Sequence, residues 1–245
     1  MKRIKLIVAY EGTKYSGWQI QPNGLTVQEM LETKISKLVK EEISIIGASR
    51  TDAGVHALGN VCVFDTTSSI PSERLKYAIN QLLPLDIRVL DSAQVSKDWH
   101  PRFSKSMKTH EYHIQAGKVI NPIGRQTQYF VHGDLDLEKM SEGVKYLIGT
   151  HDFAGFSREE CQLKNTIREI CQACIYQKED RIIFSISGYG FLYNMVRMIV
   201  GMLILIGKGK HPPNHIKQIL ENKIKDVKKI TAPPQGLILK EIKYL

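Results

Sequence analysis

The order of hydrophobic periodicities in the first half of the chain most strongly constrains its fold. Apolar residues alternate from Ile4 to Tyr10, which predicts a strand because successive strand side chains face opposite sides. Thr26 and Glu29 form a capping-box signature, and the apolar residues behind them recur at helical spacing. Strands are predicted at Ile43–Ala48 and Asn60–Asp65.

A second helix and two more strands complete this half. Apolar spacing predicts a helix from Leu75 to Leu83, ended by Pro84, and strands at Ile87–Val95 and Thr109–Ala116. The resulting order is β-α-β-β-α-β with one extra strand, which is typical of a ferredoxin-like fold.

The second half is similar in kind but less regular. It predicts a helix from Leu137 to Leu147, strands at Thr166–Gln177 and Arg181–Ser187, an apolar helix from Phe191 to Ile206, a short helix after Pro212-Pro213, and a final strand at Leu237–Tyr244. We therefore expect an α+β protein. Residues 1–120 form one ferredoxin-like half and residues 121–245 a second half, and the two share a mixed, largely antiparallel central sheet. The segment from Asn121 to Gly133 is the expected join.

Charge and composition narrow the function. The chain has 34 Lys and Arg against 25 Asp and Glu, a formal net charge of +9. A domain this basic is typical of nucleic-acid binding, although a solvated basic surface has the same composition. The longest apolar run, Met198–Ile206, is far shorter than the roughly 20 residues that a membrane span requires. The N-terminus has no signal-peptide pattern, so we expect a cytoplasmic protein without membrane contact.

The segment from Arg50 to Ala57 has the highest density of residues that could take part in catalysis. It reads Arg-Thr-Asp-Ala-Gly-Val-His-Ala and connects two apolar strands. One interpretation is a polar turn in which Asp52 accepts hydrogen bonds from local amides. The other is a catalytic carboxylate that the nearby Arg50 keeps ionised. The residues alone leave both open.

This segment resembles the signature of the tRNA pseudouridine synthase A family, and further motifs of that family follow in order along nearly the whole chain. They are Tyr10-Glu11-Gly12-Thr13, Gly17-Trp18-Gln19, Thr26-Val27-Gln28, Leu83-Pro84, Asp86-Ile87, Arg102-Phe103, His151-Asp152-Phe153, Phe191-Leu192, Met195-Val196-Arg197, Val200-Gly201, Ala232-Pro233 and Gly236-Leu237.

The resemblance implies a pseudouridine synthase fold and an isomerase that converts uridine to pseudouridine at positions 38–40 of the tRNA anticodon stem-loop. It implies no cofactor, no metal and a homodimer that binds tRNA. By similarity, Asp52 is the catalytic carboxylate, acting either as a nucleophile at C1′ or as a base toward the ribose. Arg197 pairs with it, Arg50 enters the RNA stem when the target base flips out, and Leu237 forms an apolar wall beside that base. Core packing for Leu237 and an exposed helix edge for Arg197 are the alternatives.

One departure from the family concerns the residue expected to stack on the target uracil. Aligned from Arg102-Phe103, the family has a Tyr-x-Tyr pair where this chain has His110 and Tyr112. Imidazole can stack on a base and accept a proton near neutral pH. His110 is therefore interpreted as a stacking residue and a candidate for removing the C5 proton, or as a sign of altered substrate or weakened activity. Tyr112 is a second expected contact to the substrate. Smaller departures are Ser49, Pro101 and Asp226-Val227.

Two alternative functions remain open. The run Gly188–Leu192 is similar to an RNA-recognition strand, which supports a non-catalytic RNA-binding module, and the same isomerisation on another RNA is a further alternative.

The cysteines do not indicate a metal site. Cys171 and Cys174 form a single pair, and zinc binding together with Cys161 and a histidine would need four convergent ligands. We expect these cysteines to be ordinary buried thiols.

Overall fold

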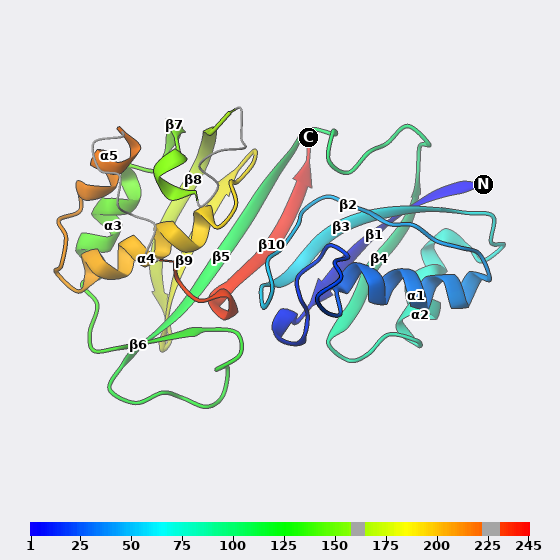
Figure 1. Cartoon of the computed structure of the whole chain (residues 1–245), viewed down its shortest axis with the longest axis horizontal. Coiled ribbons are helices and arrows are strands. Elements are labelled where there is room, and N and C mark those ends of the chain that lie inside the picture. Colours follow the sequence, from blue (N-terminus) through cyan, green and yellow to red (C-terminus); the bar gives the residue numbers. More distant parts are fainter. Residues whose placement is uncertain (158–164, 222–230) are drawn as a thin grey trace. The chain divides into compact units, whose positions relative to one another are not determined.

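A computed structural model of the protein describes residues 1–157, 165–221 and 231–245 (Figure 1). The chain divides into two compact units, residues 1–106 with 239–245 and residues 107–238. Each unit combines helices with a β-sheet, so the predicted α+β class is confirmed. The division into residues 1–120 and 121–245 stays a prediction.

The first unit has the predicted β-α-β-β-α-β order (Figure 1). Its strands lie in the order β4-β1-β3-β10, β2 pairs with β3, and the β1–β3, β1–β4 and β2–β3 pairings are antiparallel. Helices α1 and α2 contact one another, and α2 packs on β4. The elements are β1 (Lys2–Tyr10), η1 (Gly12–Lys14), α1 (Val27–Val39), β2 (Ile46–Gly47), β3 (His56–Thr66), η2 (Ser72–Arg74), α2 (Leu75–Asn80), β4 (Ile87–Val95) and residues 239–244 of β10 (Leu237–Tyr244).

The start of α1 forms as the capping box predicts. The Thr26 side chain accepts a hydrogen bond from the backbone N–H of Glu29 at 3.3 Å. Val27, Leu31 and Ile35 recur at helical spacing on one side of α1 and are fully buried. The amphipathic pattern therefore fixes both the start of this helix and the face that it packs into the core.

The strand predicted at Ile43–Ala48 is wrong in extent, because only Ile46 and Gly47 pair as β2. Side chains of α1 bind the preceding amides. Glu32 accepts from the Ile45 N–H at 2.8 Å, and Ser36 accepts from the Ile43 N–H at 3.0 Å. The apolar pattern is satisfied by burial of Ile43 and Ile45 without a strand ladder.

The second unit is built around a mixed sheet with the strand order β5-β9-β8-β7, in which β6 pairs parallel with β5 (Figure 1). Helix α3 packs on β8 and contacts α4 and α5. The elements are β5 (Ser106–Gly117), β6 (Tyr129–His132), α3 (Leu137–Lys145), β7 (Gly149–Asp152), η3 (Ala154–Phe156), β8 (Ile167–Lys178), β9 (Arg181–Gly188), α4 (Met195–Gly207), α5 (His215–Leu220) and η4 (Pro234–Gly236).

The helix predicted from Phe191 begins at Met195 instead. Asn194, the residue before it, has a φ of +58°, outside the right-handed helical region. Residues 189–194 therefore connect β9 to α4 and do not extend β9, which argues against the RNA-recognition strand. The departure Asp226-Val227 lies outside the described residues.

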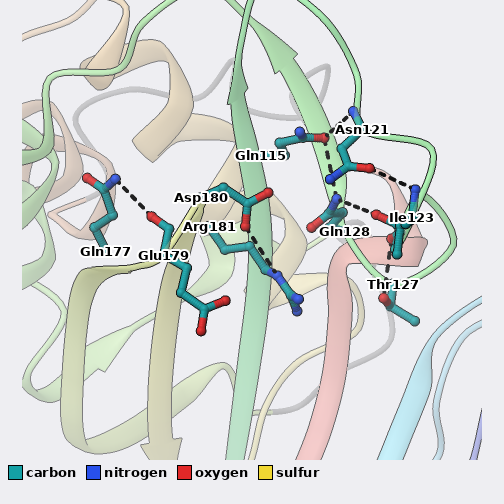
Figure 2. Close-up of polar contacts among 10 residues, drawn as sticks. Gln115, Asn121, Ile123, Thr127, Gln128, Gln177, Glu179, Asp180 and Arg181 are labelled. Carbon is teal, nitrogen blue, oxygen red and sulfur yellow. Dashed lines mark hydrogen bonds and ion pairs between the residues drawn. The ribbon is translucent and has the colours of Figure 1, made fainter.

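Buried amides order the loop between β5 and β6. Gln115 accepts hydrogen bonds from the Asn121 N–H at 3.1 Å and from the Gln128 side chain at 3.3 Å, as Figure 2 shows. Residues 129–132, inside the segment predicted as a join, form β6. Within the described residues, every helix is too short or too polar to cross a membrane.

Candidate active site

The loop that carries Asp52 leaves β2 and returns into β3. Ala48 donates a backbone hydrogen bond to Val61 at 2.7 Å, and Val55 donates one to the Asp52 carbonyl at 3.1 Å. Gly54 completes this turn with a φ of +77°, a conformation that glycine adopts without a steric penalty. Asp52 thus lies in a tight turn between strands, and its side chain is half-buried.

Two glycines of the opening motifs allow this loop to pack closely on the segment after β1. A Cβ on Gly17 would lie 2.5 Å from the Thr51 carbonyl oxygen, and one on Gly12 would lie 2.0 Å from the Val55 carbonyl oxygen. Gly17 also has a φ of +90°. The backbone on both sides of Asp52 is therefore fixed against residues that have no side chain.

A buried chain of polar side chains supports the same loop. The Tyr10 hydroxyl bonds the Thr51 hydroxyl at 2.8 Å and accepts from the Asn60 amide at 3.3 Å. Asn60 also donates to the Ser49 carbonyl at 3.1 Å. Burial raises the pKa of Tyr10, so its hydroxyl keeps its proton at neutral pH. These hydrogen bonds hold the loop at Ser49 and Thr51, on both sides of Arg50.

Arg50 itself is exposed on this loop. Its charge lowers the pKa of Arg102, although burial is the larger cause of that shift. The Arg102 guanidinium donates to the Gly47 carbonyl at 2.8 Å. The first unit therefore carries Arg102 near Arg50, which lies two residues before Asp52 on the loop.

Arg197 lies in the first turn of α4, in the second unit. Its Nε donates to the Ala232 carbonyl at 2.8 Å and its Nη1 donates to the Asn194 side chain at 2.9 Å. The Ala232 N–H donates back to the Arg197 carbonyl at 3.0 Å. Arg197 is half-buried and joins the segment before β10 to the start of α4, so it is not a side chain on an open helix edge.

Tyr112, on β5, is hydrogen-bonded to the same segment before β10. It is fully buried, and its hydroxyl donates to the Pro233 carbonyl at 2.7 Å. A Cβ on Gly236 would lie 2.5 Å from the Tyr112 ring. Leu237 follows and is 7% exposed, a burial that fits core packing as well as an apolar wall. In the second unit the structure therefore brings Tyr112 and Arg197 together with the segment that leads to Leu237.

His110 lies on the same face of β5 as Tyr112 and is 8% exposed. Its ring contacts the Phe191 ring edge-on, with centroids 4.6 Å apart. Burial, with a smaller contribution from Lys108, lowers the pKa of His110 to about 3. The imidazole is therefore neutral at physiological pH and a weak base. Among the described residues, its Nδ1 finds no hydrogen-bond partner.

The prediction that Cys171 and Cys174 are buried thiols is wrong. Cys174 is exposed and Cys171 is half-buried. The described residues contain no group of three or more His, Cys, Asp or Glu side chains that could hold a metal ion. Cys161 lies outside the described residues.

The comparisons with known proteins agree with one another. The family model described as tRNA pseudouridine synthase matches residues 6–104 and 144–245. The chain is 43% identical over 244 residues to tRNA pseudouridine synthase A of Clostridium kluyveri, covering 100% of both chains. It is 43% identical to tRNA pseudouridine synthase A of Thermoanaerobacter sp. strain X514 and 41% identical to tRNA pseudouridine synthase A 2 of Clostridium perfringens, again over 244 residues and the whole of both chains.

These matches define a pseudouridine synthase, an isomerase. The chain belongs to the tRNA pseudouridine synthase family.

The site includes residues that the sequence analysis did not single out. Tyr10, Thr51 and Asn60 support the Asp52 loop although their motifs gave no sign of it, because they meet only in the folded sheet. Arg102 belongs to a motif, but its position near Arg50 depends on its hydrogen bond to Gly47 on β2, which lies far from it in sequence.

Proposed function

We propose that this protein converts uridine to pseudouridine in the anticodon arm of tRNA and that Asp52 is its catalytic carboxylate. The observation that carries the proposal is the Asp52 loop, which is fixed by glycines and buried hydroxyls in a chain 43% identical to tRNA pseudouridine synthases A. In the reaction the N1–C1′ bond breaks and a C5–C1′ bond forms. The C5 proton is lost, and N1 gains a proton.

Asp52 either attacks C1′ or removes a proton from the ribose. Because the base must be kept and recaptured, the site has to exclude water, and one carboxylate suffices where a glycosidase uses two. Arg197 is proposed as the cation that pairs with this carboxylate, as in the family. Its guanidinium is already ordered by Ala232 and Asn194, which reduces the entropy lost when it binds a further group.

The remaining residues are proposed to receive the flipped base. Base extrusion costs a few kcal/mol, so side chains must fill the space that the base leaves. Arg50 is exposed and available for that role. His110 would stack on the uracil as a neutral ring, and its low pKa argues against its taking the C5 proton. Tyr112 and Leu237 would line the base pocket.

The experiment measures tritium released from tRNA transcripts labelled at uracil C5, followed by mapping of the modified positions. The expected result is release, with pseudouridine at positions 38–40 of the anticodon arm. Absence of release from any cellular RNA would contradict an enzyme and favour an RNA-binding module. Binding should also weaken steeply with added salt, because phosphate contacts release counterions.

His110 is the observation that favours a second candidate, the same reaction on another RNA. His110→Tyr places a tyrosine where the resemblance to the family expects one. A large gain in rate on tRNA would mark His110 as a weakened contact or one adapted to a different RNA. Equal or lower activity would support a working role for the histidine.

We also propose that the protein is a homodimer that acts in the cytoplasm. Sedimentation equilibrium of the purified protein should give the mass of two chains, and the mass of a single chain would refute this part.

A further inference from the structure

An aromatic ring is displayed on the turn that precedes β5. Phe103 is 85% exposed, and its ring stacks on the ring of His100 with centroids 4.1 Å apart and an angle of 23° between the planes. One face of the phenyl ring is therefore covered by the imidazole. An exposed phenyl ring gains little from the hydrophobic effect, so the stability of the fold does not account for its place.

The turn that holds Phe103 is rigid. Ser104 donates a backbone hydrogen bond to the His100 carbonyl at 3.0 Å, and the Arg102 N–H donates to Nδ1 of His100 at 3.1 Å. The Tyr244 hydroxyl donates to the Pro101 carbonyl at 3.0 Å, which ties the turn to β10. The stacked pair is thus ordered before any ligand arrives, and preorganisation of this kind increases affinity.

The ring is flanked by positive charge. Arg102 directly precedes Phe103, and its guanidinium donates to the Gly47 carbonyl at 2.8 Å. It lies close enough to Arg50 for the charge of Arg50 to lower its pKa, after the larger effect of burial. Within residues 1–157, 165–221 and 231–245, neither guanidinium forms a salt bridge with a carboxylate. Two cations near one another fit an anion, and an aromatic ring beside them fits a base attached to that anion.

We propose that Phe103, supported by His100, stacks on an unpaired base of the RNA substrate, and that Arg102 binds the adjoining phosphate. The inference rests on the proposed function in that the ligand is the RNA that reaches Asp52. It adds a binding element outside the residues that act on the target uridine. Stacking on an aromatic side chain tolerates any base, so this element contributes affinity and register more than sequence preference.

The test measures binding in the Asp52→Asn protein, so that no turnover disturbs the equilibrium. The probe is a fluorescently labelled anticodon stem-loop RNA, compared with a fully paired RNA duplex of the same length. Phe103→Ala should weaken stem-loop binding about tenfold and leave duplex binding unchanged, because only the stem-loop has unpaired bases. Phe103→Leu should behave like Phe103→Ala, and Phe103→Trp should bind at least as tightly as the parent.

Tyr77→Ala is the matched control. Tyr77 is also an exposed aromatic residue of the first unit, 64% exposed on α2 with the Lys76 ammonium 5.4 Å from its ring centroid. Its removal should leave binding of both RNAs unchanged. Arg102→Gln should weaken binding of both RNAs and reduce the slope of log affinity against log salt by about one, a change that Phe103→Ala should not produce.

Equal losses for stem-loop and duplex, or no loss at all, would overturn the stacking role of Phe103. A shift in oligomeric state on Phe103→Ala, without a change in RNA affinity, would also overturn it and assign the ring to contact with a second copy of the chain. The outcome is separate from that of the proposed function, which fails if the wild-type protein releases no tritium from any RNA.

Discussion

In the first unit, close packing on Gly12 and Gly17 holds the backbone of the loop with Asp52. The hydrogen bond between the Tyr10 and Thr51 hydroxyls also supports this loop. In the second unit, the candidate side chains are themselves part of the packed interior, since Tyr112 is fully buried and His110 is 8% exposed. Each unit therefore holds its own candidate residues by a different physical means.

This difference separates chemistry from stability. A change of side chain at Asp52 leaves in place the close packing on Gly12 and Gly17 and the hydrogen bonds of Tyr10, so it should alter the reaction more than the stability of the fold. A change at His110 or Tyr112 removes packed atoms and should alter both. The following experiments, from the largest expected effect to the smallest, test how far this separation holds.

Gly17→Ala should give the largest effect among the supporting residues. The new Cβ would meet the Thr51 carbonyl oxygen at 2.5 Å and would sit at a φ of +90°. We expect tritium release to fall about 100-fold or more. The free energy of unfolding should fall by about 2–5 kcal/mol from strain and overpacking, measured by urea denaturation.

Gly209→Ala is the control for backbone conformation alone, because Gly209 has a φ of +70° and nothing lies within 4 Å of its Cβ position. It should cost about 1–2 kcal/mol and leave activity unchanged. If Gly17→Ala cost no more than Gly209→Ala, close packing of the Asp52 loop would not be the reason for this glycine.

Acid should destabilise the second unit through His110. Burial lowers its pKa to about 3 in the folded protein, against about 6.5 when unfolded, so as pH falls only the unfolded chain takes up this proton. Between pH 6.5 and pH 5 the free energy of unfolding should fall by about 2 kcal/mol from this residue. Stability is therefore present above pH 6.5 and is lost as pH falls.

Comparison with His110→Phe isolates this contribution, because the other histidines are the same in both proteins. Urea denaturation of each protein at pH 7 and pH 5 should show a smaller loss for the variant. Equal losses would mean that His110 titrates normally and is not a desolvated, neutral ring.

Tyr10→Phe should have the smallest effect. It removes the hydroxyl between Thr51 and Asn60, which should cost about 1 kcal/mol and lower activity by less than tenfold, as thermal unfolding and tritium release would measure. Tyr15→Phe is the matched control, since its hydroxyl bonds Asp86 at 2.7 Å and not the loop. It should lower stability with activity kept, and an equal loss of activity in both variants would remove the special role of Tyr10.

The sequence predicted the elements whose pattern is local. The start of α1 follows from Thr26 and Glu29, and β4 and β10 have the bounds that their apolar patterns indicate. The length of β2 could not be predicted, because Glu32 and Ser36 on α1 bind amides that a strand would have used. The exposure of Cys174 depends on what packs on the faces of β8, which no local pattern records.

The same division applies to the candidate site. Asp52 and Arg197 stand out as polar residues in motifs, and a resemblance to a family assigns them roles. The hydrogen bonds from Tyr10 to Thr51 and Asn60 join residues that are 41 and 50 positions apart. Such contacts depend on strand pairing between β1 and β3, so they require the folded structure.

The central claim is that the carboxylate of Asp52 carries out the isomerisation. Single-turnover tritium release by Asp52→Asn, measured with the RNA affinity and melting temperature of the same protein, tests it most directly. Asp91→Asn, a change at a surface ion pair with Lys76, serves as the control. We expect Asp52→Asn to lower release by about three orders of magnitude or more, with RNA affinity retained and a cooperative thermal transition still present. Release within tenfold of the wild-type rate would contradict the claim.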